Sequence, residues 1–196
     1  MQQALLIALD RWVRQGVEPP ASRHPLLADG TLVAPDKIRY PALRGVQWPY
    51  HVPGGFRIDL PGPLSALPFL VPQVDADGND VAGIRLPEQA VPLGTYTDWA
   101  FRSERIGAPD TLIAMTGSYI PFAKTKSGRE TAGDPRLSIE ERYSGRADYQ
   151  KKVEENANKL VKERYLLAEH VKAIVQKAGE HWDWTMAQTG ASSGTR

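Results

Sequence analysis

Apolar residues recur with helical spacing at both ends of the chain. Near the N-terminus, Leu5, Leu9 and Trp12 fall at positions i, i+4 and i+7, with polar residues between them. This spacing predicts an amphipathic helix over residues 1–16 that ends at Gly16, a residue suited to a helix C-cap. Towards the C-terminus, the same spacing predicts helices over residues 147–164 and 168–182. Their apolar faces consist of Tyr149, Val153, Ala157 and Leu160 in the first, and of Val171, Ile174, Val175, Ala178 and Trp182 in the second.

The segments just before these two helices carry different signals. Ser138 and Glu141 have the spacing of a capping box, which predicts a short helix from residue 138 to residue 143. Residues 124–136 are mostly polar, which predicts an exposed loop. Residues 109–122 are apolar enough to be buried, but their period fits a strand and a helix equally.

Proline and glycine recur every few residues from position 18 to position 134 and leave little room for long helices there. We therefore expect loops joined by short strands. Asp29 and Gly30 predict the turn of a small hairpin over residues 26–33. Two apolar runs, 69–74 and 81–86, flank a second turn signal at residues 75–80, which predicts a central β-hairpin.

The turn at residues 75–80 also matches the first five positions of an EF-hand calcium loop. The match then fails, because Asp80 stands where the sharp-turn glycine is needed and Leu86 stands where the bidentate glutamate is needed. Pro72 and Pro87 bracket the loop in place of flanking helices. We therefore expect a hairpin turn here, not a calcium site.

The composition is that of an ordinary globular protein. Of 196 residues, 41% are hydrophobic and 24% are charged, and the net charge of +1 does not favour nucleic acid or an anionic membrane as a partner. No apolar run reaches the length of about eighteen residues needed to span a bilayer, and the apolar start of the chain lacks the basic residues of a signal peptide. Without cysteine, the chain has neither disulfides nor thiol chemistry.

Candidate catalytic residues do not assemble into a motif. Ser118 lies in the apolar 109–122 segment, but no spacing connects it with His24, His51, His170 or His181. Residues 190–194 spell G-x-S-x-G, yet a nucleophile elbow needs a strand before it, a helix after it, and acid and histidine partners later in the chain. We expect residues 187–196 to form a disordered tail. No histidine spacing typical of a metal site occurs, and we expect no metal and no cofactor.

Several sequence blocks stand out together, in this order: residues 4–13, 16–20, 26–33, 71–79, 82–87, 117–122, 133–136 and 138–143. These blocks resemble the C-terminal portion of a bacterial family of α/β-hydrolase-domain proteins. The resemblance implies an α/β fold and ester-hydrolase-like ancestry, with the nucleophile serine and the catalytic histidine lying before the block that begins at Met1. It supplies no catalytic residue to this chain. The isolated chain would then be a loop-rich α+β structure with an N-terminal helix, a central β-hairpin and C-terminal helices, as one domain or part of a domain over residues 1–186.

The resemblance implies that the chain is a C-terminal fragment or truncated homologue of a serine-type α/β hydrolase. Its partner would be the missing N-terminal hydrolase portion, and the substrate of the full-length family would be a small ester. The sequence departs from the family pattern at residues 96–99, where Gly-Trp-Asn is expected. The candidate substrate-binding residues are Tyr96, Trp99, Ser118 and Tyr119. We also expect apolar surface to be exposed on the first helix, around Leu5, Leu9 and Trp12, where the missing sheet would dock.

A function of another class stays open. The chain could be a non-enzymatic, loop-rich binding module that takes a carbohydrate or a peptide. The aromatic residues that would form such a site are Trp48, Tyr50, Tyr96 and Trp99.

Overall fold

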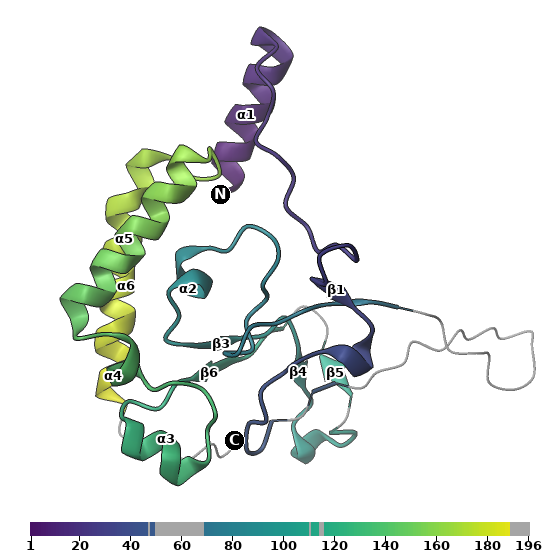
Figure 1. Ribbon diagram of the computed structural model, residues 1–196, viewed down its shortest axis with the longest axis vertical. Coiled ribbons are helices and arrows are strands. Elements are labelled where there is room, and N and C mark those ends of the chain that lie inside the picture. The colour runs from purple at the N-terminus through teal and green to yellow at the C-terminus, as the bar shows by residue number, and fades with distance from the viewer. Residues whose placement is uncertain (47, 50–68, 110, 114–115, 189–196) are drawn as a thin grey trace, which may run out of the picture.

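Two long helices, α5 (Arg146–Lys162) and α6 (Val171–Ala187), pack side by side in antiparallel directions along one flank of the molecule (Figure 1). The structure is a computed structural model, and it describes residues 1–46, 48–49, 69–109, 111–113 and 116–188. Both helices lie where the periodicity predicts them, and α6 is longer than expected because it continues to Ala187. The residues expected on the apolar face of α5 are all buried: Tyr149, Val153, Ala157 and Leu160.

Polar contacts fix how α5 and α6 lie against each other. Arg146 on α5 forms a salt bridge with Asp183 on α6, at 2.8 Å between Nε and Oδ1. The side-chain amide of Gln150 donates to the backbone oxygen of Val175 at 3.0 Å. A side chain at Gly179 would collide with the ends of Arg146 and Gln150, because its Cβ would lie 2.5 Å and 2.6 Å from them. The glycine therefore allows both side chains to cross to α6.

All strand pairs in the described part of the chain are short and antiparallel, in three two-stranded sheets. The pairs are β1 (Leu32–Val33) with β2 (Val71–Pro72), β3 (Gly94–Tyr96) with β6 (Tyr119–Pro121), and β4 (Ala100–Phe101) with β5 (Leu112–Ile113). The fold is therefore of mixed α and β class, as expected. The 109–122 segment, whose period was ambiguous, contributes β5 and β6.

The central turn forms, but only one arm of the expected hairpin is a strand. Asp75 Oδ1 accepts hydrogen bonds from the backbone amides of Asp77 and Asn79, both at 3.0 Å. Beyond the turn, the two arms meet in one bridge, Val74 with Asp80, and in one hydrogen bond from Val81 N to Gln73 O at 3.0 Å. The expectation of a strand over residues 81–86 is wrong. Asn79 ties the end of the turn to β3, and Arg85 folds back onto Asp75.

The small hairpin expected at residues 26–33 is also only partly right. Gly30 adopts a left-handed conformation with φ of 71°, and Thr31 N donates to Leu26 O at 3.1 Å, so the turn is present. Leu32 and Val33 nevertheless pair with β2, and Gln73 N extends this ladder by donating to Thr31 O at 2.8 Å. A long-range partner has replaced the local one.

Residues 124–136 are not the exposed loop that their polarity predicts, because they contain helix α3 (Lys126–Ala132). Thr125 caps it by accepting from Gly128 N at 3.1 Å, and Gly133 ends it in a left-handed conformation. Arg136 is only 4% exposed, and its guanidinium bonds Asp134, Thr95 and the backbone oxygen of Ile120. The capping box that begins α4 (Ile139–Arg142) is confirmed, since Ser138 N donates to Glu141 Oε2 at 2.9 Å.

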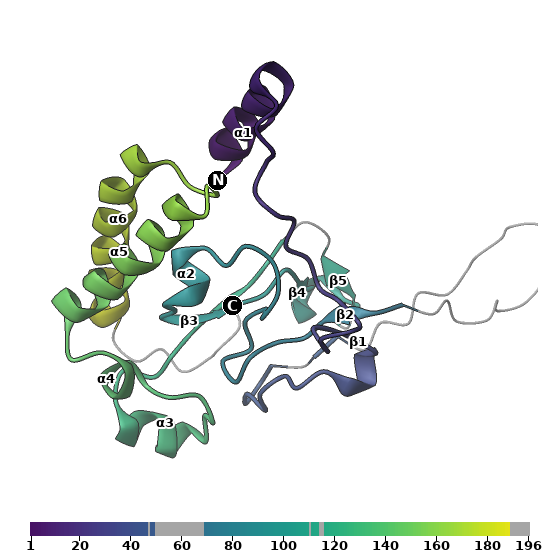
Figure 2. The same ribbon diagram turned by 45° about the horizontal axis from the view of Figure 1, so that its top comes forward.

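Helix α1 (Gln2–Gln15) ends at Gly16 as predicted and stands away from the rest of the molecule (Figures 1 and 2). Only Ala4 and Ala8 are buried in it, while Leu5, Leu9 and Trp12 are 38%, 50% and 51% exposed, so the expected apolar surface is present. The remaining elements are η1 (Pro35–Lys37), α2 (Pro87–Ala90), η2 (Glu104–Ile106) and η3 (Ala168–His170). Among the described residues, no helix combines the length and the apolar character needed to cross a membrane.

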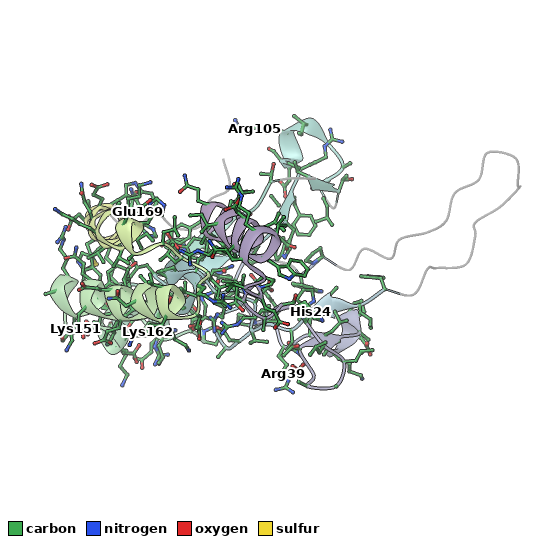
Figure 3. All side chains as sticks on the ribbon, turned by 90° about the horizontal axis from the view of Figure 1, so that it is seen from above. His24, Arg39, Arg105, Lys151, Lys162 and Glu169 are labelled. Atoms are coloured by element: carbon green, nitrogen blue, oxygen red, sulfur yellow. The ribbon has the colours of Figure 1, made fainter. Side chains whose placement is uncertain are left out.

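Lys151 and Lys162 of α5 are exposed and point outward (Figure 3). Of the tail expected to be disordered, residue 187 closes α6, and residues 189–196 lie outside the described part of the chain.

Candidate functional site

The β3–β6 ladder brings Tyr96 and Tyr119 into direct contact. The two residues are paired in the antiparallel register, and their ring centroids lie 5.0 Å apart. The Tyr119 hydroxyl donates to the backbone oxygen of Leu93 at 3.2 Å. Burial raises the pKa of both phenols, so both hydroxyls stay protonated near neutral pH and act as neutral hydrogen-bonding groups.

Ser118 and Trp99 meet one step further along the same ladder. Ser118 Oγ donates to the backbone oxygen of Trp99 at 3.2 Å, and Ser118 N donates to Thr97 Oγ1 at 3.0 Å. The four candidate residues thus form two adjacent contacts, Tyr96 with Tyr119 and Ser118 with Trp99. The Trp99 ring itself packs in a second aromatic group, with centroids 5.9 Å from Tyr40 and 5.8 Å from Trp48.

His181 is a functional candidate that the sequence interpretation missed, because no spacing connects it with Ser118. Its ring centroid lies 5.1 Å from that of Tyr119 and 5.8 Å from that of Trp184. Burial lowers the pKa of His181, partly offset by the Glu88 carboxylate, so the imidazole is neutral at pH 7. The signal was available, because His181 follows Ile174 and Ala178 at the i, i+4, i+7 spacing of an apolar face.

The model of a family described as an alpha/beta hydrolase domain matches residues 1–176. The chain belongs to the alpha/beta hydrolase domain family. No curated protein and no solved structure matches it.

The serine chemistry of a hydrolase is not assembled around Ser118 in the described residues. A nucleophilic serine needs a base within hydrogen-bonding reach, and the Ser118 hydroxyl is instead bound to a carbonyl oxygen. The His181 ring contacts Tyr119, and no hydrogen bond joins it to Ser118 among the described residues. His170 bonds Gln3 at 2.7 Å, His24 is exposed, and His51 lies outside the described residues. So do residues 190–194, which carry the G-x-S-x-G pattern.

Asp75 and Asp77 of the central turn are paired with arginines. Asp75 Oδ2 lies 2.7 Å from an Arg85 nitrogen, and Asp77 Oδ2 accepts from Arg142 Nη1 at 2.8 Å. Asp80 is half-buried, and this burial raises its pKa. Within the described part of the chain, no three histidine, aspartate or glutamate side chains are grouped so that they could hold a metal ion.

The aromatic residues proposed for a binding module do not form one surface. Trp48 and Trp99 pack edge to face, with centroids 5.8 Å apart. Tyr96 stacks in the separate contact with Tyr119, and Tyr50 lies outside the described residues. Trp48 and Trp99 therefore belong to one aromatic group and Tyr96 to another.

Proposed function

We propose that this chain forms the substrate-binding part of a serine-type ester hydrolase whose nucleophile and catalytic histidine come from another stretch of polypeptide. Membership of the alpha/beta hydrolase domain family supports the reaction class. One observation supports the inference that this chain binds substrate but does not supply the nucleophile: Ser118 Oγ donates a hydrogen bond to the Trp99 backbone oxygen. A hydroxyl in this contact positions a loop, whereas a nucleophile must be free to give its proton to a base.

The residues that would contact substrate are Tyr96, Trp99, Ser118 and Tyr119. All four are half-buried, so they combine accessible surface with fixed positions. The tyrosine rings offer an apolar surface, and the neutral Tyr96 hydroxyl can donate to an ester oxygen. This combination suits a small, uncharged ester.

Exposed apolar surface on α1 supports the proposal that another stretch of polypeptide supplies the nucleophile and the catalytic histidine. Leu6 and Val13 are 69% and 77% exposed, in addition to the exposed Leu9 and Trp12. A helix that exposes so many large apolar side chains is stabilised when another surface covers them. The nucleophile-bearing part of the hydrolase would provide that surface.

Ester hydrolysis by the chain alone tests the proposal. With p-nitrophenyl acetate and butyrate, we expect no turnover above the buffer rate, and no difference between the unchanged chain and Ser118→Ala. Turnover that Ser118→Ala abolishes would show that this chain carries its own nucleophile and would overturn the proposal. A matched control is Ser127→Ala, since Ser127 lies exposed on α3.

A second candidate is the non-enzymatic binding module. The observation that favours it is the half-buried aromatic group of Tyr40, Trp48 and Trp99. Saturable quenching of tryptophan fluorescence by oligosaccharides, lost in Trp99→Ala, would support it. The DNA upstream of the Met1 codon separates the two candidates. A reading frame with a serine elbow and a histidine motif supports the hydrolase, and unrelated sequence supports the module.

A further inference from the structure

A cavity of about 150 Å³ lies where helices α2, α5 and α6 meet. Its inner wall is formed by three buried residues, Pro87, Tyr149 and Val153. A cavity of about this volume holds a benzene-sized apolar group. The space therefore fits a single branched aliphatic group better than the drug-sized ligands that need several hundred Å³, roughly 300–1,000 Å³.

Residues of α6 line the cavity at the spacing of one helix face. Ile174, Lys177, Ala178 and His181 fall at i, i+3, i+4 and i+7 along the helix. The same face also packs on α5, because Ile174 and Ala178 lie against the core cluster that contains Tyr149 and Val153. The cavity is the space that remains between these side chains and α2.

The rim of the cavity carries two opposite charges. Glu88 from α2 and Lys177 from α6 both line the cavity and are both exposed. Among the described residues, no side chain of opposite charge lies within 4.0 Å of either, so they do not neutralise each other. A carboxylate and an ammonium group that are not paired with each other and lie beside an apolar wall are complementary to a ligand that carries both charges on an apolar body.

We propose that this cavity binds a small aliphatic zwitterion, an α-amino acid of the leucine type. Glu88 binds its ammonium group, Lys177 binds its carboxylate, and the side chain enters between Val153, Ile174 and Ala178. His181 stays neutral beside Tyr119 and offers one hydrogen bond to the ligand head group. The site is independent of ester hydrolysis, since it uses none of Tyr96, Trp99, Ser118 or Tyr119 as a ligand contact.

Three probes that share one side chain test the proposal: L-leucine, L-leucinamide and 4-methylpentanoate. L-Leucinamide lacks the carboxylate and 4-methylpentanoate lacks the ammonium group. Binding is followed by the NMR signals of the His181 ring and by saturation-transfer from protein to ligand. We expect L-leucine to bind at millimolar concentration and each of the other probes to bind about tenfold more weakly, because each loses one charge-assisted contact.

Variants assign each contact. Lys177→Gln should abolish the preference for L-leucine over L-leucinamide, and Glu88→Gln should abolish the preference over 4-methylpentanoate. Lys172→Gln on α6 and Glu154→Gln on α5 are matched controls, because both residues are exposed and neither lines the cavity. Ala178→Val narrows the cavity and should weaken L-leucine binding, with circular dichroism used to check that the helices remain.

Three results would overturn the proposal. One is the absence of L-leucine binding at millimolar concentrations. Another is equal binding of 4-methylpentanoate and L-leucine to the unchanged chain, which would show that the ammonium group is not recognised. The third is L-leucine binding that Ala178→Val, Glu88→Gln and Lys177→Gln all leave unchanged, which would place the ligand elsewhere.

Discussion

Arg142 reaches back 65 residues along the chain to bind Asp77, with 2.8 Å between Nη1 and Oδ2. This contact joins the capping-box helix α4 to the central turn at residues 75–80. The two side chains are only 15% and 16% exposed, and the Arg142 guanidinium also lies 4.2 Å from the centroid of the Phe122 ring. The pair therefore holds the turn against the core through both charge and packing.

Removing either partner of this pair should destabilise the fold. We expect Asp77→Asn and Arg142→Met each to lower the free energy of unfolding by about 1–3 kcal/mol, because a hydrogen-bonded charge is left partly buried without its partner. Urea unfolding of both single variants and the double variant gives the coupling energy. The exposed pair of Asp10 and Arg14 on α1 is the control, and Asp10→Asn should cost about 0.5 kcal/mol or less. Strictly additive effects at Asp77 and Arg142 would contradict the coupling.

Calcium should leave the stability of the protein unchanged. Asp75 and Asp77 would have to give up Arg85 and Arg142 to coordinate an ion, and Leu86 offers no carboxylate where the bidentate ligand is needed. The melting temperature, measured with millimolar calcium and then with a chelator, should be the same. An increase of several degrees with calcium would contradict this prediction, because a ligand that binds the folded state raises its stability.

Elements that depend on local signals were predicted well from the sequence. The periodic apolar faces of α1, α5 and α6, the capping box of α4, and the turns at Gly30 and Gly78 are all set by residues close together in the chain. What could not be predicted depends on distant partners. Leu32 and Val33 pair with β2, and the sequence offers no signal that prefers this partner over the nearby residues 26–27.

Helix α3 and the candidate site also depend on contacts that could not be predicted from the sequence. Polar side chains in residues 124–136 form hydrogen bonds within the protein, through the Thr125 cap and the contacts of Arg136. A hydropathy pattern does not reveal such hydrogen bonds. The contact between Tyr96 and Tyr119 requires the β3–β6 register, which only the fold supplies. His181 could have been placed from helical spacing alone, but the neighbours that lower its pKa could not.

Asn79 should be one of the most sensitive positions in the loop-rich half of the chain. It is fully buried; its side-chain amide donates to Gly94 O at 3.2 Å, and its Oδ1 accepts from Tyr96 N at 2.8 Å. Asn79→Ala leaves both backbone groups without a partner, so we expect a loss of about 1–3 kcal/mol in the free energy of unfolding. Asn158→Ala, on the exposed face of α5, is the control and should change stability by about 0.5 kcal/mol or less. Equal effects of the two substitutions in urea unfolding would refute the bridging role of Asn79.

The free energy of unfolding should increase with pH between the pKa of His181 in the folded protein and its pKa in the unfolded chain. Its ring is packed against Tyr119 from β6 and Trp184 from α6, with Glu88 of α2 the nearby carboxylate and Lys177 on its own helix. Burial lowers the pKa of His181 below the ordinary value of 6.5, which it regains on unfolding. Between these two pKa values the unfolded chain binds more protons than the folded chain. The free energy of unfolding therefore rises with pH up to about 6.5 and falls as the solution becomes more acidic.

A substitution that keeps an aromatic ring at position 181 but removes the titratable imidazole isolates the contribution of His181 to the pH dependence of stability. His181→Phe should flatten the pH dependence of the free energy of unfolding below about pH 6.5, because phenylalanine can keep the contact with Tyr119 but binds no proton. The same substitution at the exposed His24 serves as the control. An NMR titration of the His181 ring protons gives the folded pKa directly. A midpoint at or above 6.5 would contradict the desolvated environment, because a buried, neutral imidazole must resist protonation until the solution is more acidic than that.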